Sequence, residues 1–372
     1  MTDKALIYIP DISGFTKFVT QTEVKHSEHI ISELISIILN SNELMFNVSE
    51  IEGDAVLFYK KGDPPKLSDL LIQSKKMFIK FHEHLNIIER DNVCQCGACR
   101  TASNLTLKFI THFGELSEVQ IQNFNKIMGS DVILAHRLLK NRINTREYLL
   151  LTEKYLNTQN TAALQEETGI RLIENIERIE NFGEVKTKFI DFNYFKSEIP
   201  KVREKPDIKK MTDADFSIDI KAPLLLVHSV LIDANTKKEW IPEIKKIKGA
   251  SDINRVNSTH TCVFENMEIH FVTEGIEKKE KELIYSERGE FETGLKFITD
   301  YKLEEKINFT KVSVKIFPGL SKNAQEKKPQ GFFANLRNKL ILYKLKKSIK
   351  KSLNGLKQYT ENLSLQKAPD SK

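Results

Sequence analysis

The sequence contains few cysteines and no long apolar run, and each shortage argues against a class of protein. Only 4 of the 372 residues are cysteine, which speaks against a fold held together by several disulfide bonds. No apolar run reaches the roughly 18 residues that a membrane-spanning helix needs. The first residues lack a basic segment followed by an apolar one, so we expect no signal peptide. Together these absences predict a cytoplasmic protein.

The composition is that of a folded chain with an uneven distribution of charge. Hydrophobic residues make up 40% and charged residues 29% of the sequence, which is typical of globular proteins. The length is sufficient for two domains. The net charge is +6, and residues 322–357 carry eleven Lys or Arg against one Glu. The basic character therefore belongs to the C-terminal segment, while the rest of the chain is slightly acidic.

The first half of the sequence alternates strand and helix patterns. Helices are predicted where apolar residues recur at helical spacing, and strands where short apolar or alternating runs occur. A hairpin is expected at 46–61, with Glu52, Gly53 and Asp54 at its turn. This order predicts an α+β domain over 1–195, followed by a charged linker with two prolines at 196–211. The other predicted elements are strands at 4–10, 105–114 and 183–194, and helices at 24–46, 67–90 and 129–141.

The second half predicts a domain over 212–363. Its alternating segments indicate consecutive antiparallel strands, and the basic segment of about 331–360 indicates a long final helix. A tail of 364–372 follows. We find no internal repeat.

Two carboxylates occur at comparable places in the first domain. Asp11 follows the first strand, and Asp54 lies in the hairpin turn. The segment Asp11-Ile12-Ser13-Gly14-Phe15-Thr16 and the segment Gly53-Asp54-Ala55-Val56, about 40 residues apart with a helix between, resemble the two metal-binding motifs of class III nucleotidyl cyclases. The resemblance covers residues 4–195 and implies a ferredoxin-like cyclase-type domain. The alternative is that both aspartates only cap turns.

The resemblance implies a set of site residues. Asp11, Ile12 and Asp54 would hold Mg²⁺ or Mn²⁺ with a nucleoside triphosphate. Glu50 and Lys126 fall at the base-reading positions, although this combination matches neither the adenylyl nor the guanylyl pattern. Arg137 matches the arginine that stabilises the transferring phosphoryl group, whereas Ile133 replaces the asparagine that orients the ribose. In this family the site forms between the two chains of a dimer, so a homodimer is implied.

A compact cysteine loop lies between the predicted helix 67–90 and the next strand. Cys94, Cys96 and Cys99 form a C-x-C-x-x-C pattern, which in a reducing compartment indicates zinc more often than a disulfide. Zinc requires a fourth ligand, and His82 is the histidine we assign to it, with His84 and His112 as neighbouring candidates. Redox-active or simply packed thiols are the alternative.

The second domain resembles the START-like (SRPBCC) helix-grip family. The resemblance rests on the element order and on Ala222-Pro223 and Trp240-Ile241-Pro242. It implies an apolar cavity that holds a lipid or another apolar molecule, although the same residues could fill an ordinary core. The residues predicted to line the cavity are Trp240, Phe264, Phe271, Phe297 and Tyr301. The two-domain layout also resembles an uncharacterised bacterial family.

Three functions remain open at this stage. The first is a sensing protein whose catalytically degenerate cyclase-like domain binds nucleotide and metal, while the second domain binds an apolar ligand. The second is an active cyclase of altered base preference, and the third is a lipid carrier with a dimerisation scaffold. The basic final helix suggests peripheral membrane contact or a packed grip helix with solvated lysines. It lacks the interleaved aromatics of a nucleic-acid surface, so we expect no nucleic-acid partner.

Overall fold

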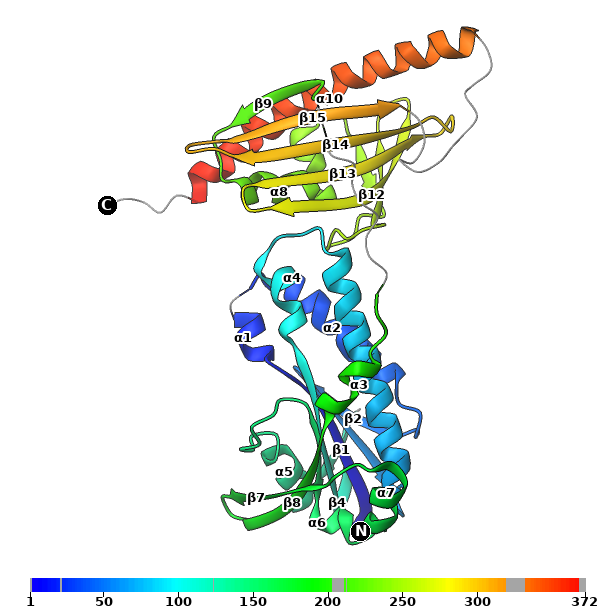
Figure 1. The fold of residues 1–372 in the computed structure, drawn as a ribbon, viewed down its shortest axis with the longest axis vertical. Coiled ribbons are helices and arrows are strands. Elements are labelled where there is room, and N and C mark those ends of the chain that lie inside the picture. Colours follow the sequence, from blue (N-terminus) through cyan, green and yellow to red (C-terminus); the bar gives the residue numbers. More distant parts are fainter. Residues whose placement is uncertain are drawn as a thin grey trace, which may run out of the picture. The chain divides into compact units, whose positions relative to one another are not determined.

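The computed structural model describes residues 2–20, 22–122, 124–202, 211, 213–318 and 332–367. It is a mixed α+β structure with two compact units, each built on its own sheet (Figure 1). Unit 1 comprises the described residues of Met1–Glu89 and Thr101–Arg203, and unit 2 comprises those of Arg90–Arg100 and Glu204–Lys372. Among the described helices, none is long and apolar enough to cross a bilayer.

Unit 1 is built on a mixed sheet whose strand order is β2-β3-β1-β4-β6-β8-β7, with β5 paired to β4. All neighbouring strands on this path are antiparallel except β4 and β6. The predicted hairpin is present, and Gly53 occupies its turn with a φ of +61°. The strands are β1 Asp3–Ser13, β2 Asn47–Glu52, β3 Ala55–Lys61, β4 Thr106–Ile121, β5 Phe124–Met128, β6 Tyr148–Thr152, β7 Ile173–Ile179 and β8 Gly183–Asp191.

Strand β1 is central to unit 1 and is buried on both faces. Residues 5–12 are all buried, because helices cover the sheet on each side. On one side Tyr8 donates to or accepts from Ser74 of α3 at 2.9 Å. On the other, Ile7 and Ile9 belong to the cluster that includes Leu134 of α5. The helices in this half of the chain are α1 Phe15–Thr20, α2 Val24–Asn40, α3 Leu67–Asp91, α4 Gly97–Thr101, α5 Ser130–Arg137, α6 Glu153–Leu156 and α7 Thr161–Thr168.

Gly114 does not end its strand as predicted. Strand β4 continues through it to Ile121 and pairs with β5, a strand that the sequence pattern did not reveal. A Cβ at Gly114 would lie 2.3 Å from Cγ of Asp131. Glycine is therefore required by the close approach of the Asp131 side chain and not by a turn. Strands β6 and β7 were also not predicted, and the predicted helix 24–46 ends at Asn40.

Unit 2 is an antiparallel sheet of order β10-β11-β12-β13-β14-β15-β9, accompanied by the long helix α10. The apolar Leu353 and Leu356 of α10 are buried. Gly355 allows α10 to approach α9, because a Cβ there would lie 2.0 Å from the carbonyl oxygen of Trp240. The elements are β9 Phe216–Ile220, α8 Leu224–Ile232, α9 Lys237–Trp240, β10 Lys246–Lys248, β11 Thr259–Val263, β12 Glu268–Lys279, β13 Glu282–Phe291, β14 Lys296–Glu305, β15 Thr310–Pro318 and α10 Phe332–Lys367.

Candidate functional site

The two predicted metal carboxylates lie at the same end of neighbouring strands. Asp11 of β1 is opposite Ala55 of β3, the residue after Asp54. The N–H of Ile12 donates to the main-chain oxygen of Asp54 at 2.9 Å. The structure therefore brings Asp11, Ile12 and Asp54 together, as the cyclase resemblance implied.

A lysine that the sequence analysis did not single out lies beside this pair. Lys108 of β4 is directly opposite Asp11, because β1 lies between β3 and β4. Its Nζ is 2.9 Å from Oδ2 of Asp11 and also donates to the main-chain oxygen of Leu139 at 2.9 Å. The side chains of Lys108 and Asp11 are only 16% and 10% exposed, so the ammonium is held in place and supplies a positive charge to the pair.

The pKa of Asp54 reflects this crowding of charge. Partial burial, and after it the negative charge of Asp11, raise this pKa from 3.8 to about 6, although a main-chain hydrogen bond and the charge of Lys108 oppose the rise. Two carboxylates in one partly buried place are the oxygen ligands that Mg²⁺ and Mn²⁺ prefer. The residues therefore fit a divalent cation at Asp11 and Asp54, in competition with the ammonium of Lys108.

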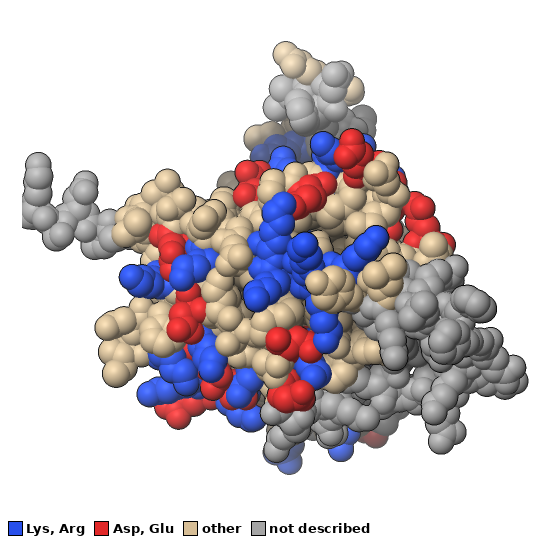
Figure 2. Space-filling model, turned by 90° about the horizontal axis from the view of Figure 1, so that it is seen from above, with Lys and Arg blue, Asp and Glu red and all other residues tan. Residues whose placement is uncertain are grey.

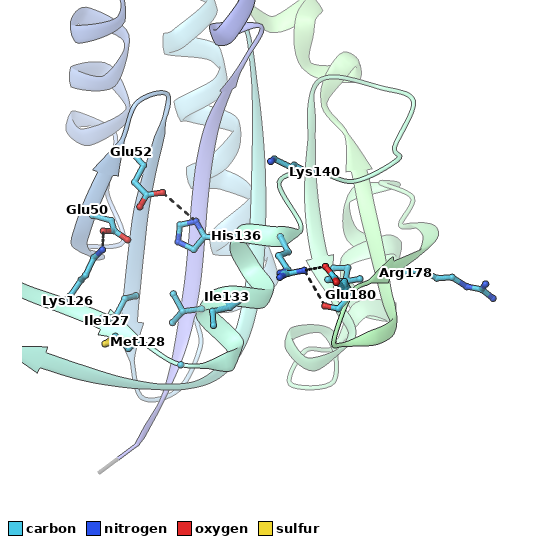
Figure 3. A pocket seen from close by; sticks show the side chains of 14 residues that line it. Glu50, Glu52, Lys126, Ile127, Met128, Ile133, His136, Lys140, Arg178 and Glu180 are labelled. Atoms are coloured by element: carbon cyan, nitrogen blue, oxygen red, sulfur yellow. Dashed lines mark hydrogen bonds and ion pairs between the residues drawn. The ribbon is translucent and has the colours of Figure 1, made fainter.

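A groove of about 780 Å³ lies on unit 1, between β2, β5, α5 and β7 (Figure 3). Glu50 and Glu52 of β2 lie at one end of it, and Lys140 and Arg178 lie toward the other. Arg137 also lines it. The stretch between them is apolar, with Ile127, Met128, Val132 and Ile133. Asp11 and Asp54 are not among its lining residues.

The predicted base-reading residues meet in this groove. Nζ of Lys126 is 3.0 Å from Oε2 of Glu50 (Figure 3). Beside them, Nδ1 of His136 is 3.9 Å from Oε2 of Glu52. Glu50 and Lys126 are thus brought together, but they form an ion pair in which each neutralises the charge of the other. His136 was not predicted as a site residue, and only its position one turn after Ile133 on α5 could have suggested it.

Arg137 and Ile133 also line the groove, as their places in the sequence motif implied. Nη1 of Arg137 is 3.4 Å from Oε2 of Glu180, and the arginine side chain is 40% exposed. Ile133 is 53% exposed, although it is apolar. An exposed isoleucine offers neither a hydrogen-bond donor nor an acceptor, so this position cannot orient a ribose.

Unit 2 encloses a small cavity between its sheet and α10. All five aromatic residues predicted for it line it, but its volume is about 60 Å³, whereas sites for drug-sized ligands span roughly 300–1,000 Å³. Its wall is also partly polar. Nζ of Lys237 lies 2.8 Å from Oε2 of Glu287, both side chains being about 95% buried.

The cavity wall contains polar atoms whose hydrogen-bonding capacity is not used within the described part of the chain. Nε1 of Trp240 and Oγ1 of Thr299 are buried and find no partner among those residues. Glu287, in contrast, also accepts hydrogen bonds from Tyr285 and Tyr301 at 3.3 Å each. The cavity therefore suits a few water molecules or a small polar molecule better than a lipid.

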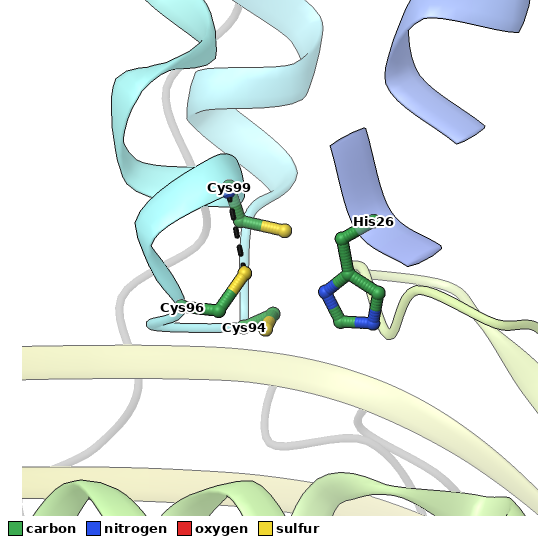
Figure 4. A group of neighbouring side chains, drawn as sticks. All are labelled: His26, Cys94, Cys96 and Cys99. Atoms are coloured by element: carbon green, nitrogen blue, oxygen red, sulfur yellow. Dashed lines mark hydrogen bonds between the residues drawn. The ribbon is translucent and has the colours of Figure 1, made fainter. Parts of the chain in front are cut away.

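The cysteine loop brings three thiols together, but His82 is not with them. Cys94, Cys96 and Cys99 lie side by side (Figure 4). His82 lies within the 25-residue helix α3, and its Nε2 is 2.6 Å from Oε1 of Glu147. At about 1.5 Å per residue, the nine residues from His82 to Asp91 place the histidine more than 10 Å before the loop begins. The prediction of His82 as the fourth ligand is therefore wrong. His84 and His112 are likewise engaged elsewhere, with Glu33 and Asp131.

The lysines of α10 make ion pairs within unit 2. Lys346 is 2.6 Å from Asp215, and Lys351 pairs with Glu243. Seen from above, Lys and Arg side chains gather near the middle of the visible face, with Asp and Glu around them (Figure 2). Leu353 and Leu356 of α10 are buried, whereas Leu340, Tyr343 and Leu365 of the same helix are exposed. Membrane contact through this helix stays a prediction. Residues 319–331 of the basic segment lie outside the described residues.

Comparisons with known proteins give the following similarities. A family described as "Protein of unknown function (DUF2652)" matches residues 31–148. An uncharacterized protein of Mycobacterium tuberculosis, Rv2561/Rv2562, is 27% identical over 161 residues, which cover 43% of this chain and 73% of that protein.

Solved structures that resemble the chain include adenylyl and guanylyl cyclase domains, over about half of its length. The adenylyl cyclase CyaB from P. aeruginosa is 16% identical, with a TM-score of 0.36, over 51% of this chain and 94% of that one. A guanylyl cyclase domain from the fungus Blastocladiella emersonii is 13% identical, with a TM-score of 0.36, over 51% and 97%. A hypothetical protein from Helicobacter pylori is 14% identical, with a TM-score of 0.33, over 43% and 98%.

Proposed function

We propose that unit 1 is a catalytically degenerate, class III cyclase-like module that binds a nucleoside triphosphate together with Mg²⁺ or Mn²⁺. The groove carries this proposal, because its basic end and its apolar stretch match the phosphates and the base of a nucleotide. Arg137, Lys140 and Arg178 offer cations for phosphates. The apolar stretch suits a base, and Glu50 can accept hydrogen bonds from the amino group of a purine.

The divalent cation would be held by Asp11 and Asp54, where it would neutralise phosphate charge. These residues lie outside the groove, so one chain offers two half-sites rather than one complete site. We therefore propose that a second copy completes the site. Met128 and Ile133 support this, because both line the groove and are more than half exposed, as residues covered by a partner would be in a free chain.

Three features explain why the module would bind without turnover. A cyclase reaction joins the ribose 3′-oxygen to the α-phosphorus and releases pyrophosphate. Ile133 cannot position the ribose for this attack. Lys108 already forms an ion pair with Asp11, and Lys126 forms one with Glu50. An active cyclase of altered base preference is the second candidate, favoured only by the retention of Asp11, Asp54 and Arg137.

For unit 2 we propose a START-like, ligand-binding role. The antiparallel sheet with its long helix α10 supports it, together with the cavity that the predicted aromatic residues line. The cavity volume favours a small molecule over a lipid, and so argues for a sensing role rather than a lipid carrier. This role is independent of the nucleotide proposal.

The test of the nucleotide proposal is binding and turnover of ATP, GTP, CTP and UTP with Mn²⁺. We expect saturable binding by calorimetry, loss of binding in Asp54→Ala, and no cyclic product by mass spectrometry. Ile133→Asn is the informative variant, because it restores an amide without touching the metal residues. Absence of binding by every nucleotide would contradict the proposal, and cyclic product from the unaltered chain would favour the active cyclase.

A further inference from the structure

The cysteine loop between α3 and β4 has a geometry that neither the cyclase-like site nor the cavity requires. Cys94, Cys96 and Cys99 each offer a sulfur, and these atoms all lie within 4.8 Å of one another (Figure 4). None of the three forms a disulfide, and Cys94 and Cys99 are buried. In a tetrahedral site with Zn–S bonds of about 2.3 Å, neighbouring sulfurs are roughly 3.8 Å apart. The observed spacing needs only small adjustments to reach that arrangement.

From this geometry we infer that Cys94, Cys96 and Cys99 bind a zinc ion. Thiolate sulfur in tetrahedral sites selects zinc over Mg²⁺ or Ca²⁺, which require oxygen ligands. The three sulfurs would fill three of the four positions of a tetrahedral zinc ion (Figure 4).

The surrounding backbone already supports charged sulfur. The N–H of Cys99 donates to Sγ of Cys96 at 3.4 Å, a contact that stabilises a thiolate. The side-chain amide of Asn92 donates to the main-chain oxygen of Cys99 at 2.9 Å, and so fixes the end of the loop. These bonds hold the loop in the conformation in which its sulfurs converge. Zinc binding would then stabilise the turn from α3 into α4.

The experiment measures metal content in the full chain purified without chelator. We expect about one zinc per chain by plasma mass spectrometry, and, after exchange with Co²⁺, the charge-transfer and ligand-field bands of a tetrahedral thiolate site. Cys96→Ser should lose both, because it removes one ligand at a partly exposed position where serine is tolerated. Cys262→Ser is the matched control, since Cys262 is a buried cysteine on β11 outside the cluster, and it should keep the metal.

Two results for the unaltered chain would overturn the zinc site itself. One is iron in place of zinc. The other is a chain without metal and without Co²⁺ bands in which two thiols are lost to a disulfide. Circular dichroism of each variant distinguishes loss of metal from failure to fold.

Discussion

Lys108 Nζ and Asp11 Oδ2 lie 2.9 Å apart, so a lysine ammonium is paired with one of the two carboxylates to which we assign a metal ion. The pairing follows from register, because the two residues are directly opposite on β1 and β4. Whether unit 1 binds a cation therefore depends on competition between a tethered ammonium and a free metal ion.

Replacement of Lys108 by Met tests this competition. A charge-assisted hydrogen bond contributes roughly 1.5–3 kcal/mol, so we expect Mn²⁺ to bind Lys108→Met about 10–100-fold more tightly than the unaltered chain. The measurement is the free Mn²⁺ signal in electron paramagnetic resonance. Lys4→Met is the control, because Lys4 is an exposed residue of the same sheet. Equal affinity in both variants would show that Lys108 does not compete.

Asp54 is expected to make stability depend on pH between about 4 and 6. Its pKa rises from 3.8 to about 6 on folding, chiefly through burial, so the folded state holds the proton more tightly. Its contribution is therefore favourable below pH 4 and is lost as the pH rises through 6. We expect Asp54→Asn to raise the melting temperature at pH 7.5 but not at pH 4. Asp63→Asn, at an exposed position, should change it at neither pH.

Gly114→Ala should destabilise unit 1 through its clash with Asp131. The Asp131 carboxylate cannot withdraw easily, because it is 2.9 Å from Nε2 of His112 and 2.7 Å from Nζ of Lys154. We expect a loss of about 1–3 kcal/mol in urea denaturation. In the Asp131→Ala background the same change should cost less, since the clashing atoms are gone. Equal costs in the two backgrounds would mean that the clash is not the cause.

The Lys237–Glu287 pair should be costly to break but not to replace. Removing one partner leaves a buried charge, so Lys237→Met is expected to cost about 3–5 kcal/mol in the free energy of unfolding. The double variant Lys237→Met with Glu287→Leu should recover much of that loss. The adjacent Lys238 is 60% exposed, and Lys238→Met should change stability by less than about 0.5 kcal/mol. A similar loss at both lysines would contradict the importance of the buried pair.

Short-range patterns in the sequence predicted the regular elements and the motif positions. The helix over 67–90 and the hairpin turn at Gly53 were found because apolar spacing and turn chemistry are local properties. The convergence of Asp11 with Asp54 was implied by the resemblance to class III cyclases, because the hairpin of β2 and β3 does not by itself determine that β3 lies beside β1. The cysteine spacing identified the zinc candidates because the C-x-C-x-x-C pattern is also a local property of the sequence.

Only the tertiary structure decided which residues from distant parts of the sequence contact these positions. Lys108 reaches Asp11 through strand register, and a shift of one residue would turn its side chain to the other face. His82 pairs with Glu147 and not with the cysteines, because distance along the chain does not report distance in space. The size of the unit 2 cavity likewise depends on how side chains of several strands and α10 pack together. These outcomes are set by long-range packing, and no local pattern in the sequence encodes them.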